Sequence, residues 1–289
     1  MKPKVLIIGI KGMAGHLLYE YFKERNIYEL YGIARNIKET EYIFNLDVSN
    51  TDDLVQIIND EDFDCIINCI GILNKDAEDH PAKAIWFNSY FPHFLEEITV
   101  KKKTRIIHIS TDCVFSGKEG GYTEYDFKNG IGYYAQSKAL GELDNTKDVT
   151  LRTSIIGPEL NTNGIGLFNW FMNQSVDTKL KGFSKAYWSG ITTLELAKVI
   201  EQLILQNISG LIQIPAPVKI DKYNLLRLFN TVFRNGKMTI ENNSDYCVDK
   251  SLESLRTDFT YSIPDYLTML EEQKKWMLEH PEIYRNYSL

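Results

Sequence analysis

Residues 5–22 read Val-Leu-Ile-Ile-Gly-Ile-Lys-Gly-Met-Ala-Gly-His-Leu-Leu-Tyr-Glu-Tyr-Phe, and this stretch decides the fold. Its first part, Val5–Ile8, is a short apolar run without alternation, which is typical of a parallel strand buried on both faces. From about Ala14 to Arg25 the apolar residues recur at helical spacing. The stretch therefore predicts a strand, a tight turn and a helix.

Three glycines punctuate that turn. Gly9 permits a tight turn, Gly12 lets the backbone approach a pyrophosphate, and Gly15 allows the helix to pack closely on the strand. The start of a helix also offers free N–H groups and a positive dipole to phosphates. The three-residue spacing differs from the G-x-G-x-x-G form of dehydrogenases. The turn indicates a dinucleotide site, and a glycine turn without a ligand stays open as the alternative.

The same strand–helix rhythm continues to about residue 157. Such alternation predicts an α/β fold, a doubly wound parallel sheet of the Rossmann type. The expected strands are 29–34, 42–46, 65–70, 105–109 and one from 149 to 152, and the expected helices are 51–58 with Thr51 as its N-cap, 83–100 and 133–143.

The pattern loosens after Gly157. Residues 158–187 are rich in Asn, Gly and aromatic residues, and they have no regular rhythm. A helix is expected at 193–206 and a strand at 211–214, followed by helices to the C-terminus. We therefore expect residues 1–157 to form an NAD(P)-binding domain, with a return segment near 190–206. Residues 158–289 would be mostly a smaller α+β substrate-binding cap.

Composition excludes several classes of function. The net charge is −7, whereas proteins that bind nucleic acids through phosphates need a basic surface. The four cysteines form no C-x-x-C pair and the five histidines have no ligand spacing, so no metal site is expected. No apolar run approaches the ~18 residues of a membrane span. We expect a cytoplasmic protein that binds neither nucleic acid nor membrane.

The end of the second expected strand bears on the choice of cofactor. It reads Gly32-Ile-Ala-Arg35, with no acidic residue to hold the adenosine ribose hydroxyls. An arginine there suits a 2′-phosphate, which favours NADPH while leaving NADH possible; a solvated Arg35 is the alternative. Asp47 and Val48, just after the third strand, are candidates for the adenine pocket, although Asp47 also fits a loop or N-cap role.

Two further segments carry chemical groups. Ser110–Gly117 follows a buried strand, and residues past the carboxyl ends of such strands face the ligand crevice. On a helix, Tyr134 and Lys138 form an i, i+4 pair on one face. A lysine ammonium near a phenol is expected to lower the pKa of Tyr134 from about 10, which makes it a usable acid or base. Thr111 can donate a hydrogen bond to a developing oxyanion.

Together these segments resemble the extended short-chain dehydrogenase/reductases, and most closely the dTDP-4-dehydrorhamnose reductase family. The resemblance spans residues 1 to about 157 and also includes Asn88. It is carried by Gly9–Gly15, Asn68–Gly71, the Ser-Thr-Asp-x-Val-Phe-x-Gly pattern of 110–117, Tyr-x-x-Ser-Lys-x-x-Gly-Glu at 134–142, and Leu151–Ser154.

The resemblance implies an NAD(P)H-dependent reductase of a 4-keto-6-deoxy nucleotide sugar, in deoxysugar and surface polysaccharide biosynthesis. It implies that Tyr134 protonates the sugar oxyanion and that Lys138 also binds the nicotinamide ribose. The implied residues are Thr111, Tyr134 and Lys138 for catalysis, Gly9, Lys11, Gly12 and Met13 around the pyrophosphate, and Cys69, Ile70 and Gly71 on the nicotinamide side.

One departure concerns the substrate. The family usually has a tyrosine after the Asp of Ser-Thr-Asp, and this chain has Cys113. A smaller side chain there leaves room for a 2-acetamido group, which would extend the resemblance to UDP-linked sugars. Asp112, Cys113 and Trp188, from the aromatic cluster of the expected cap, are the candidate substrate contacts.

Two rival functions stay open. One is an epimerase or dehydratase that retains NAD, although Asp112-Cys113 lacks the Asp-Glu pair that dehydratases usually carry. The other is a non-catalytic regulatory subunit that keeps the nucleotide-binding fold. A homodimer is common for this type of protein.

Overall fold

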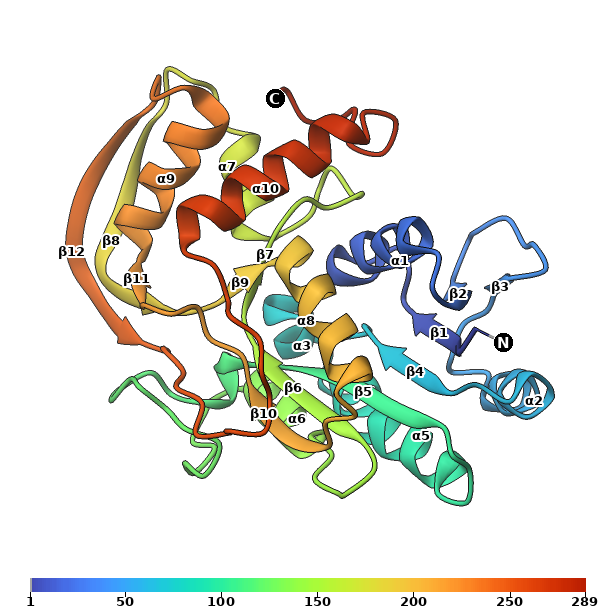
Figure 1. Ribbon diagram of the computed structural model, residues 1–289. Coiled ribbons are helices and arrows are strands. Elements are labelled where there is room, and N and C mark those ends of the chain that lie inside the picture. The colour runs from blue at the N-terminus through green and yellow to red at the C-terminus, as the bar shows by residue number, and fades with distance from the viewer. Residues whose placement is uncertain (1) are drawn as a thin grey trace.

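The computed structural model describes residues 2–289 and is built on a parallel sheet of seven strands (Figure 1). The strand order is β10-β6-β5-β4-β1-β2-β3, so the direction of winding reverses between β1 and β4. This confirms the predicted doubly wound fold. The strands are β1 (Lys4–Ile8), β2 (Glu29–Ala34), β3 (Ile43–Asn45), β4 (Cys65–Asn68), β5 (Arg105–Thr111), β6 (Val149–Thr153) and β10 (Gly210–Gln213).

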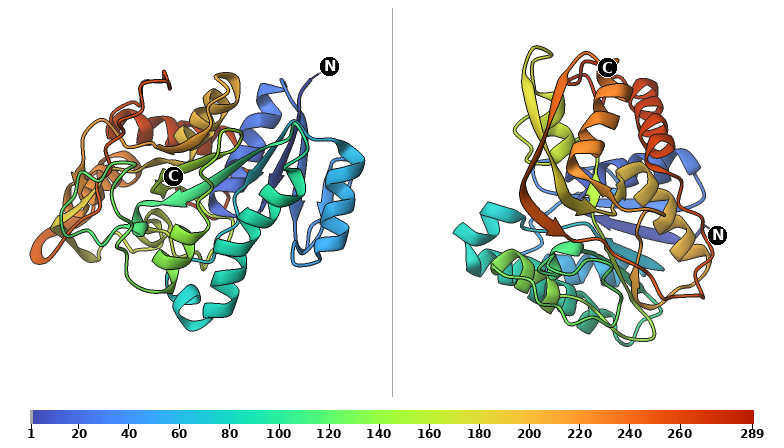
Figure 2. Two further views of the ribbon diagram at one scale, coloured as in Figure 1. Left: turned by 90° about the horizontal axis from the view of Figure 1, so that it is seen from below. Right: turned by 90° about the vertical axis from the view of Figure 1, so that its left-hand side faces the viewer.

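Helices cover both faces of this sheet, as the two turned views show (Figure 2). Alternate residues of β1 enter different cores. Val5 and Ile7 pack in the cluster that contains α1 (Met13–Arg25) and α8 (Thr193–Leu205). Leu6 and Ile8 pack with residues of α2 (Thr51–Glu61) and α5 (Phe91–Thr99) on the other face. Burial on both faces explains why the strand is an apolar run without alternation.

The expected helix 83–100 is the end of a longer helical region with an irregular centre. It comprises α3 (Asn74–Asp79), α4 (Pro81–Ala84), the π-helical turn η1 (Ile85–Tyr90) and α5. Within η1, Asn88 accepts a hydrogen bond from Ile72 N–H at 2.8 Å and donates to Ser137 Oγ at 3.0 Å. The turn thus ties the loop after β4 to α6 (Tyr133–Leu140). π-Helical turns are frequent at functional sites.

The second half of the chain adds a three-stranded sheet, at the left of Figure 1. Its long strand β8 (Lys179–Trp188) pairs in parallel with β12 (Thr239–Asp249) and antiparallel with β11 (Ile220–Asp221). The remaining elements are β7 (Ile155–Ile156), β9 (Ile191–Thr192), α7 (Leu167–Met172), α9 (Lys222–Arg234), α10 (Tyr266–Glu279) and the 3₁₀ turn η2 (Asp112–Val114).

Several expectations for local structure were wrong. The segment 158–187 contains α7 and β8, and the expected succession of helices to the C-terminus is interrupted by β12. β12 reads Thr-Ile-Glu-Asn-Asn-Ser-Asp-Tyr-Cys-Val-Asp, whose Asn, Asp and Ser residues are depleted in strands. Thr51 is the first residue of α2 and Asn50 is its N-cap. Strand β10 joins the large sheet although it lies beyond the predicted return segment, so the domain boundaries stay a prediction.

Candidate active site in the crevice of the large sheet

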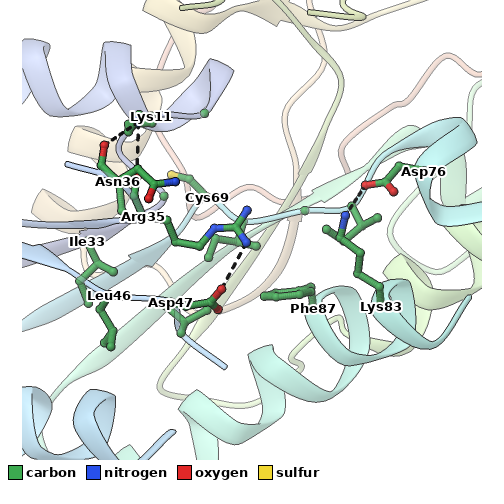
Figure 3. Close-up of a pocket in the computed structure, with 17 residues that line it drawn as sticks. Lys11, Ile33, Arg35, Asn36, Leu46, Asp47, Cys69, Asp76, Lys83 and Phe87 are labelled. Atoms are coloured by element: carbon green, nitrogen blue, oxygen red, sulfur yellow. Dashed lines mark hydrogen bonds and ion pairs between the residues drawn. The ribbon is translucent and has the colours of Figure 1, made fainter. Parts of the chain in front are cut away.

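A cavity of about 450 Å³ lies at the point where the strand order reverses (Figure 3). Ligands of doubly wound sheets bind in this place, outside the carboxyl ends of the strands. Nine of the residues proposed from the sequence for cofactor binding line the cavity: Gly9, Lys11, Gly12, Arg35, Asp47, Val48, Cys69, Ile70 and Gly71. Met13 is not among the lining residues; its terminal methyl group lies toward Gly166.

The glycine turn has the backbone geometry that the sequence predicts. Gly9 has φ +94°, a conformation that other residues rarely adopt. A Cβ on Gly15 would lie 2.2 Å from the carbonyl oxygen of Gly9, so α1 approaches the turn closely only because residue 15 is glycine. Gly12 caps α1 without a side-chain hydrogen bond. The first turn of α1 therefore keeps free N–H groups for an anionic ligand.

Charged residues lie on two sides of the cavity, with Lys11, Arg35 and Asp47 on one side and the ion pair of Asp76 with Lys83 on the other (Figure 3). Arg35 Nη1 forms an ion pair with Asp47 Oδ2 at 3.2 Å, and the two side chains are 66% and 41% exposed. Lys11 Nζ donates to the carbonyl oxygen of Asn36 at 3.0 Å. An ion pair this exposed contributes little to stability and exchanges readily with water or an anion. Arg35 is thus free to leave Asp47 for a phosphate.

The groups with chemical potential lie at the carboxyl end of β5 and on α6. Thr111 Oγ1 donates to Asp112 Oδ1 at 3.1 Å and accepts from Cys113 N–H at 3.1 Å. Tyr134 is half-buried, and Thr111 is one of the side chains that act on its phenol. Lys138 is buried, and its Nζ donates to the carbonyl oxygen of Ile109 at 2.6 Å. The structure thus brings the three expected catalytic side chains to one end of β5.

Known proteins match both the sequence and the fold. The sequence model of the RmlD substrate binding domain family matches residues 2–177, more than half of the chain. The chain belongs to this family. A dTDP-4-dehydrorhamnose reductase from Aggregatibacter actinomycetemcomitans is 32% identical over 157 residues, 52% of this chain and 51% of that protein.

Two further proteins that are similar to this chain bear on its function and its fold. The methionine adenosyltransferase 2 subunit beta of Bos taurus is 30% identical over 141 residues, 48% of this chain and 41% of that protein. The chain thus spans about half the length of the curated relatives it matches. A dTDP-4-dehydrorhamnose reductase from Bacillus anthracis str. Ames, solved in complex with NADP, has a TM-score of 0.79 at 21% identity, over 96% of this chain and 100% of that one. That likeness establishes the fold.

The expectation for the acidity of Tyr134 was wrong for this RmlD family member without a ligand. Burial raises the pKa of Tyr134 above its ordinary value, the charges of Cys113 and Asp112 act in the same direction, and Thr111 opposes them. Lys138 does not lower it, because its Nζ bonds to Ile109 O and faces His108 Nε2 at 3.2 Å. The i, i+4 spacing predicts that Tyr134 and Lys138 share one face of the helix. It does not determine whether the Lys138 ammonium contacts the Tyr134 phenol.

The candidate substrate residues lie near cap lysines. Burial raises the pKa of Asp112, while the charges of Lys250 and Lys222 lower it. Lys222 Nζ lies 4.7 Å from the ring centroid of Trp188. Trp188 is buried and stacks on Tyr266, so these contacts fix its indole ring, and its contact with substrate stays a prediction. Burial raises the pKa of Cys113 to about 11, which keeps this thiol protonated at neutral pH.

Sequence reasoning assigned no individual role to three residues around the catalytic groups. His108 faces Lys138, and Asn68 holds the far side of the same imidazole. Glu78 of α3 accepts hydrogen bonds from the backbone N–H groups of Tyr133 and Tyr134, so it caps the helix that carries the catalytic pair. His108 occurs in the same strand as Thr111, but no spacing rule indicates that a lysine on α6 bends toward it.

Two observations bear on metals and membranes. Among residues 2–289, no three or more His, Cys, Asp or Glu side chains gather as a metal site would require. No helix of the described part of the chain is long and apolar enough to cross a membrane.

Proposed function

We propose that the protein is an NADPH-dependent oxidoreductase that reduces the 4-keto group of a 6-deoxy nucleotide sugar, in deoxysugar and surface polysaccharide biosynthesis. One observation carries the proposal. The glycine-lined cavity and the Thr111–Tyr134–Lys138 group lie at the carboxyl ends of neighbouring strands of one sheet. A cofactor and a carbonyl substrate can therefore meet there.

The residues of the cavity fit a dinucleotide. Gly12 leaves space that a Cβ would partly fill, since such an atom would lie 3.3 Å from Gly9 O. The uncapped start of α1 would hold the pyrophosphate, Arg35 the 2′-phosphate, and Asp47 and Val48 the adenine. The related Bacillus anthracis structure contains NADP. When bound, NADPH would supply the hydride.

The protein's side chains would handle the proton. A general acid must still hold its proton when the sugar oxyanion forms, and the raised pKa of Tyr134 meets that requirement. Tyr134 Oη would donate that proton to the substrate oxygen. Thr111 Oγ1 would donate a hydrogen bond to the same oxygen as negative charge develops. Lys138 would bind the cofactor ribose and stabilise the phenolate left on Tyr134.

Substrate class and setting are part of the proposal. The small Cys113 next to Asp112 favours a sugar with a bulky substituent such as a 2-acetamido group, linked to dTDP or UDP. Asp112 and Cys113 would contact the sugar, with Lys222 and Lys250 on the cap side. We propose a cytoplasmic enzyme, with a homodimer as the expected assembly.

The direct experiment is NADPH oxidation with a panel of 4-keto-6-deoxy nucleotide sugars on dTDP and UDP, with and without a 2-acetamido group. We expect consumption with one class of sugar. A second candidate function comes from the relative that is a methionine adenosyltransferase subunit. NADPH binding with no turnover on any sugar would favour such a regulatory role and contradict the reductase.

A further inference from the structure

A chain of hydrogen bonds runs beneath the candidate active site from the cavity wall to Lys138. Asn68 ends β4 and His108 is its register partner on β5, and both are fully buried. Ile70 N–H donates to Asn68 Oδ1 at 3.1 Å. Asn68 Nδ2 lies 3.2 Å from His108 Nδ1, and His108 Nε2 lies 3.2 Å from Lys138 Nζ.

The donor and the acceptor of each hydrogen bond in this series can be assigned in turn. A backbone N–H only donates, so the Asn68 atom that faces Ile70 must be the oxygen Oδ1. The other side of that amide, Nδ2, donates to His108 Nδ1, which must then be unprotonated. Burial holds the pKa of His108 well below its ordinary value, so the imidazole is neutral. A neutral ring with a bare Nδ1 carries its proton on Nε2.

That proton points at Lys138. An ammonium has three donors and no lone pair, so the Nε2–H of His108 would meet another N–H. A free amine accepts this hydrogen bond and still donates to Ile109 O. We propose that His108 is a positioning residue that holds Lys138 as a free amine in the protein without ligands. The inference rests on the proposed function for its catalytic meaning.

The surroundings of Lys138 agree with this assignment. Burial lowers the pKa of Lys138 to about 8, while the charges of Glu142 and Cys69 raise it. Glu142 is committed to Arg152 and Lys128 through ion pairs of 2.7 and 3.1 Å. Of the other acids on elements packed against α6, Asp112 acts on Tyr134 and Glu78 caps the helix. Asp76 and Asp79 of α3 form ion pairs with Lys83 and Lys75. Burial alone leaves the ammonium as the main form at neutral pH, so the proposal requires the Nε2–H of His108 to lower the pKa of Lys138 further.

This arrangement gives Lys138 two states. With His108 it is a neutral amine, and when it leaves His108 for a bound ribose it takes up a proton from solvent at Nζ. The imidazole does not relay that proton, because its other nitrogen ends on the amide of Asn68. The amine state has a kinetic consequence, since kcat/KM follows the ionisation of the free enzyme. Its alkaline limb would report the pKa of Lys138.

The first test uses NMR on the unliganded protein and requires no turnover. The ¹⁵N shifts of His108 report which ring nitrogen is protonated, and the ¹³Cε shift of Lys138, assigned by its loss in Lys138→Met, reports its titration. We expect the Nε2–H form and a titration midpoint below about pH 7, so that the amine predominates at neutral pH, against about 10.4 for an ordinary lysine. An Nδ1–H imidazole, or a midpoint above about 7, at which the ammonium predominates at neutral pH, would overturn the proposal.

Two variants then separate this role from simple packing. His108→Gln can turn its amide oxygen toward the ammonium, and Asn68→Ala frees His108 to adopt the other tautomer. Both should raise the Lys138 midpoint by ~1 unit or more and move the alkaline limb of kcat/KM by the same amount. Thr104→Val is the matched control, because it removes a buried hydrogen bond to Phe63 O elsewhere in the sheet.

The outcomes distinguish this inference from the proposed function. An unchanged Lys138 midpoint in folded His108→Gln protein would contradict the role of His108 even if the enzyme is a reductase. If the variants fail to fold, the tautomer and midpoint of the unsubstituted protein still decide. The expected NMR result without turnover on any sugar would support the network and contradict the reductase alone.

Discussion

The two ends of the crevice differ in how far their polar and charged side chains are exposed to solvent. At the end lined by Lys11, Arg35 and Asp47, charged side chains are exposed and paired across water. At the other end His108 and Lys138 are buried, and Lys138 is held by contacts with His108 and Ile109 of β5. Charges at the first end are screened and replaceable, whereas a charge that forms at the second end would act in a low-dielectric surrounding.

The difference indicates a division of work between binding and chemistry. Exposed charges contribute modest, salt-dependent affinity and steer an anion into the cavity. Buried groups have shifted pKa values, and these values determine which groups can donate or accept a proton during a reaction. Substitutions at the two ends should therefore affect different quantities, the cofactor Kd at one end and the rate and its pH dependence at the other.

The largest effect is expected for Tyr134→Phe. Loss of the phenol removes the proton donor, and such a donor typically contributes 10²–10⁴-fold in rate, so kcat should fall by about that factor. The Kd for NADPH should change little, as measured by fluorescence titration. Tyr133→Phe is the control, because Tyr133 is the neighbouring and more exposed phenol. Activity of Tyr134→Phe within a few-fold of the original would refute its assignment as the acid.

The substitution Glu142→Gln should lower the free energy of unfolding of the protein. Glu142 is buried, accepts two hydrogen bonds from Arg152 and one from Ser110, and removal of one partner of a buried pair costs about 3–5 kcal/mol. Its hydrogen bonds with Arg152 help to hold the pKa of Glu142 below its ordinary value, against the effect of burial. The contribution is therefore present above the unfolded pKa of ~4.3 and lost as pH falls through the folded pKa.

Urea unfolding at several pH values measures this effect. The difference in the free energy of unfolding between Glu142→Gln and the original should be largest near neutral pH and shrink in acid. Glu271→Gln, at an exposed helix position, should change stability little at any pH. A Glu142→Gln effect that does not depend on pH would contradict the ionised pair.

Arg35→Gln should give the smallest effect of the three. The side chain is 66% exposed, so loss of its contact with a 2′-phosphate should weaken NADPH binding by roughly tenfold. NADH binding should be almost unchanged, because NADH has no such phosphate. Lys38→Gln, an exposed lysine on the same loop, is the matched charge control. Equal weakening for both cofactors would place the 2′-phosphate elsewhere.

Raising the ionic strength tests the difference in solvent exposure between the two ends of the crevice. The gap between the original protein and Arg35→Gln should narrow as ionic strength rises, since the charges at this end are exposed. The Lys138 midpoint should stay nearly constant under the same change. Equal salt sensitivity at both ends would break the distinction between them.

Features that depend on local sequence could be predicted, whereas features that depend on tertiary contacts could not. Strands of the large sheet are buried on both faces, so their apolar runs were recognisable, and the glycine turn has a backbone requirement that only glycine meets. β12 was missed because its stability comes from pairing with β8 rather than from its polar sequence. The sign of the Tyr134 shift and the Lys138–His108 contact depend on burial and side-chain direction, which helical spacing does not specify.

The most direct test of the central claim is transfer of the hydride itself. The protein would be incubated with NADPH deuterated at both C4 positions of the nicotinamide and with the 4-keto-6-deoxy nucleotide sugars, and the products analysed by mass spectrometry. A reductase places one deuterium on the sugar ring, at the former carbonyl carbon. Sugars that gain no deuterium, although the protein binds NADPH, would contradict the account.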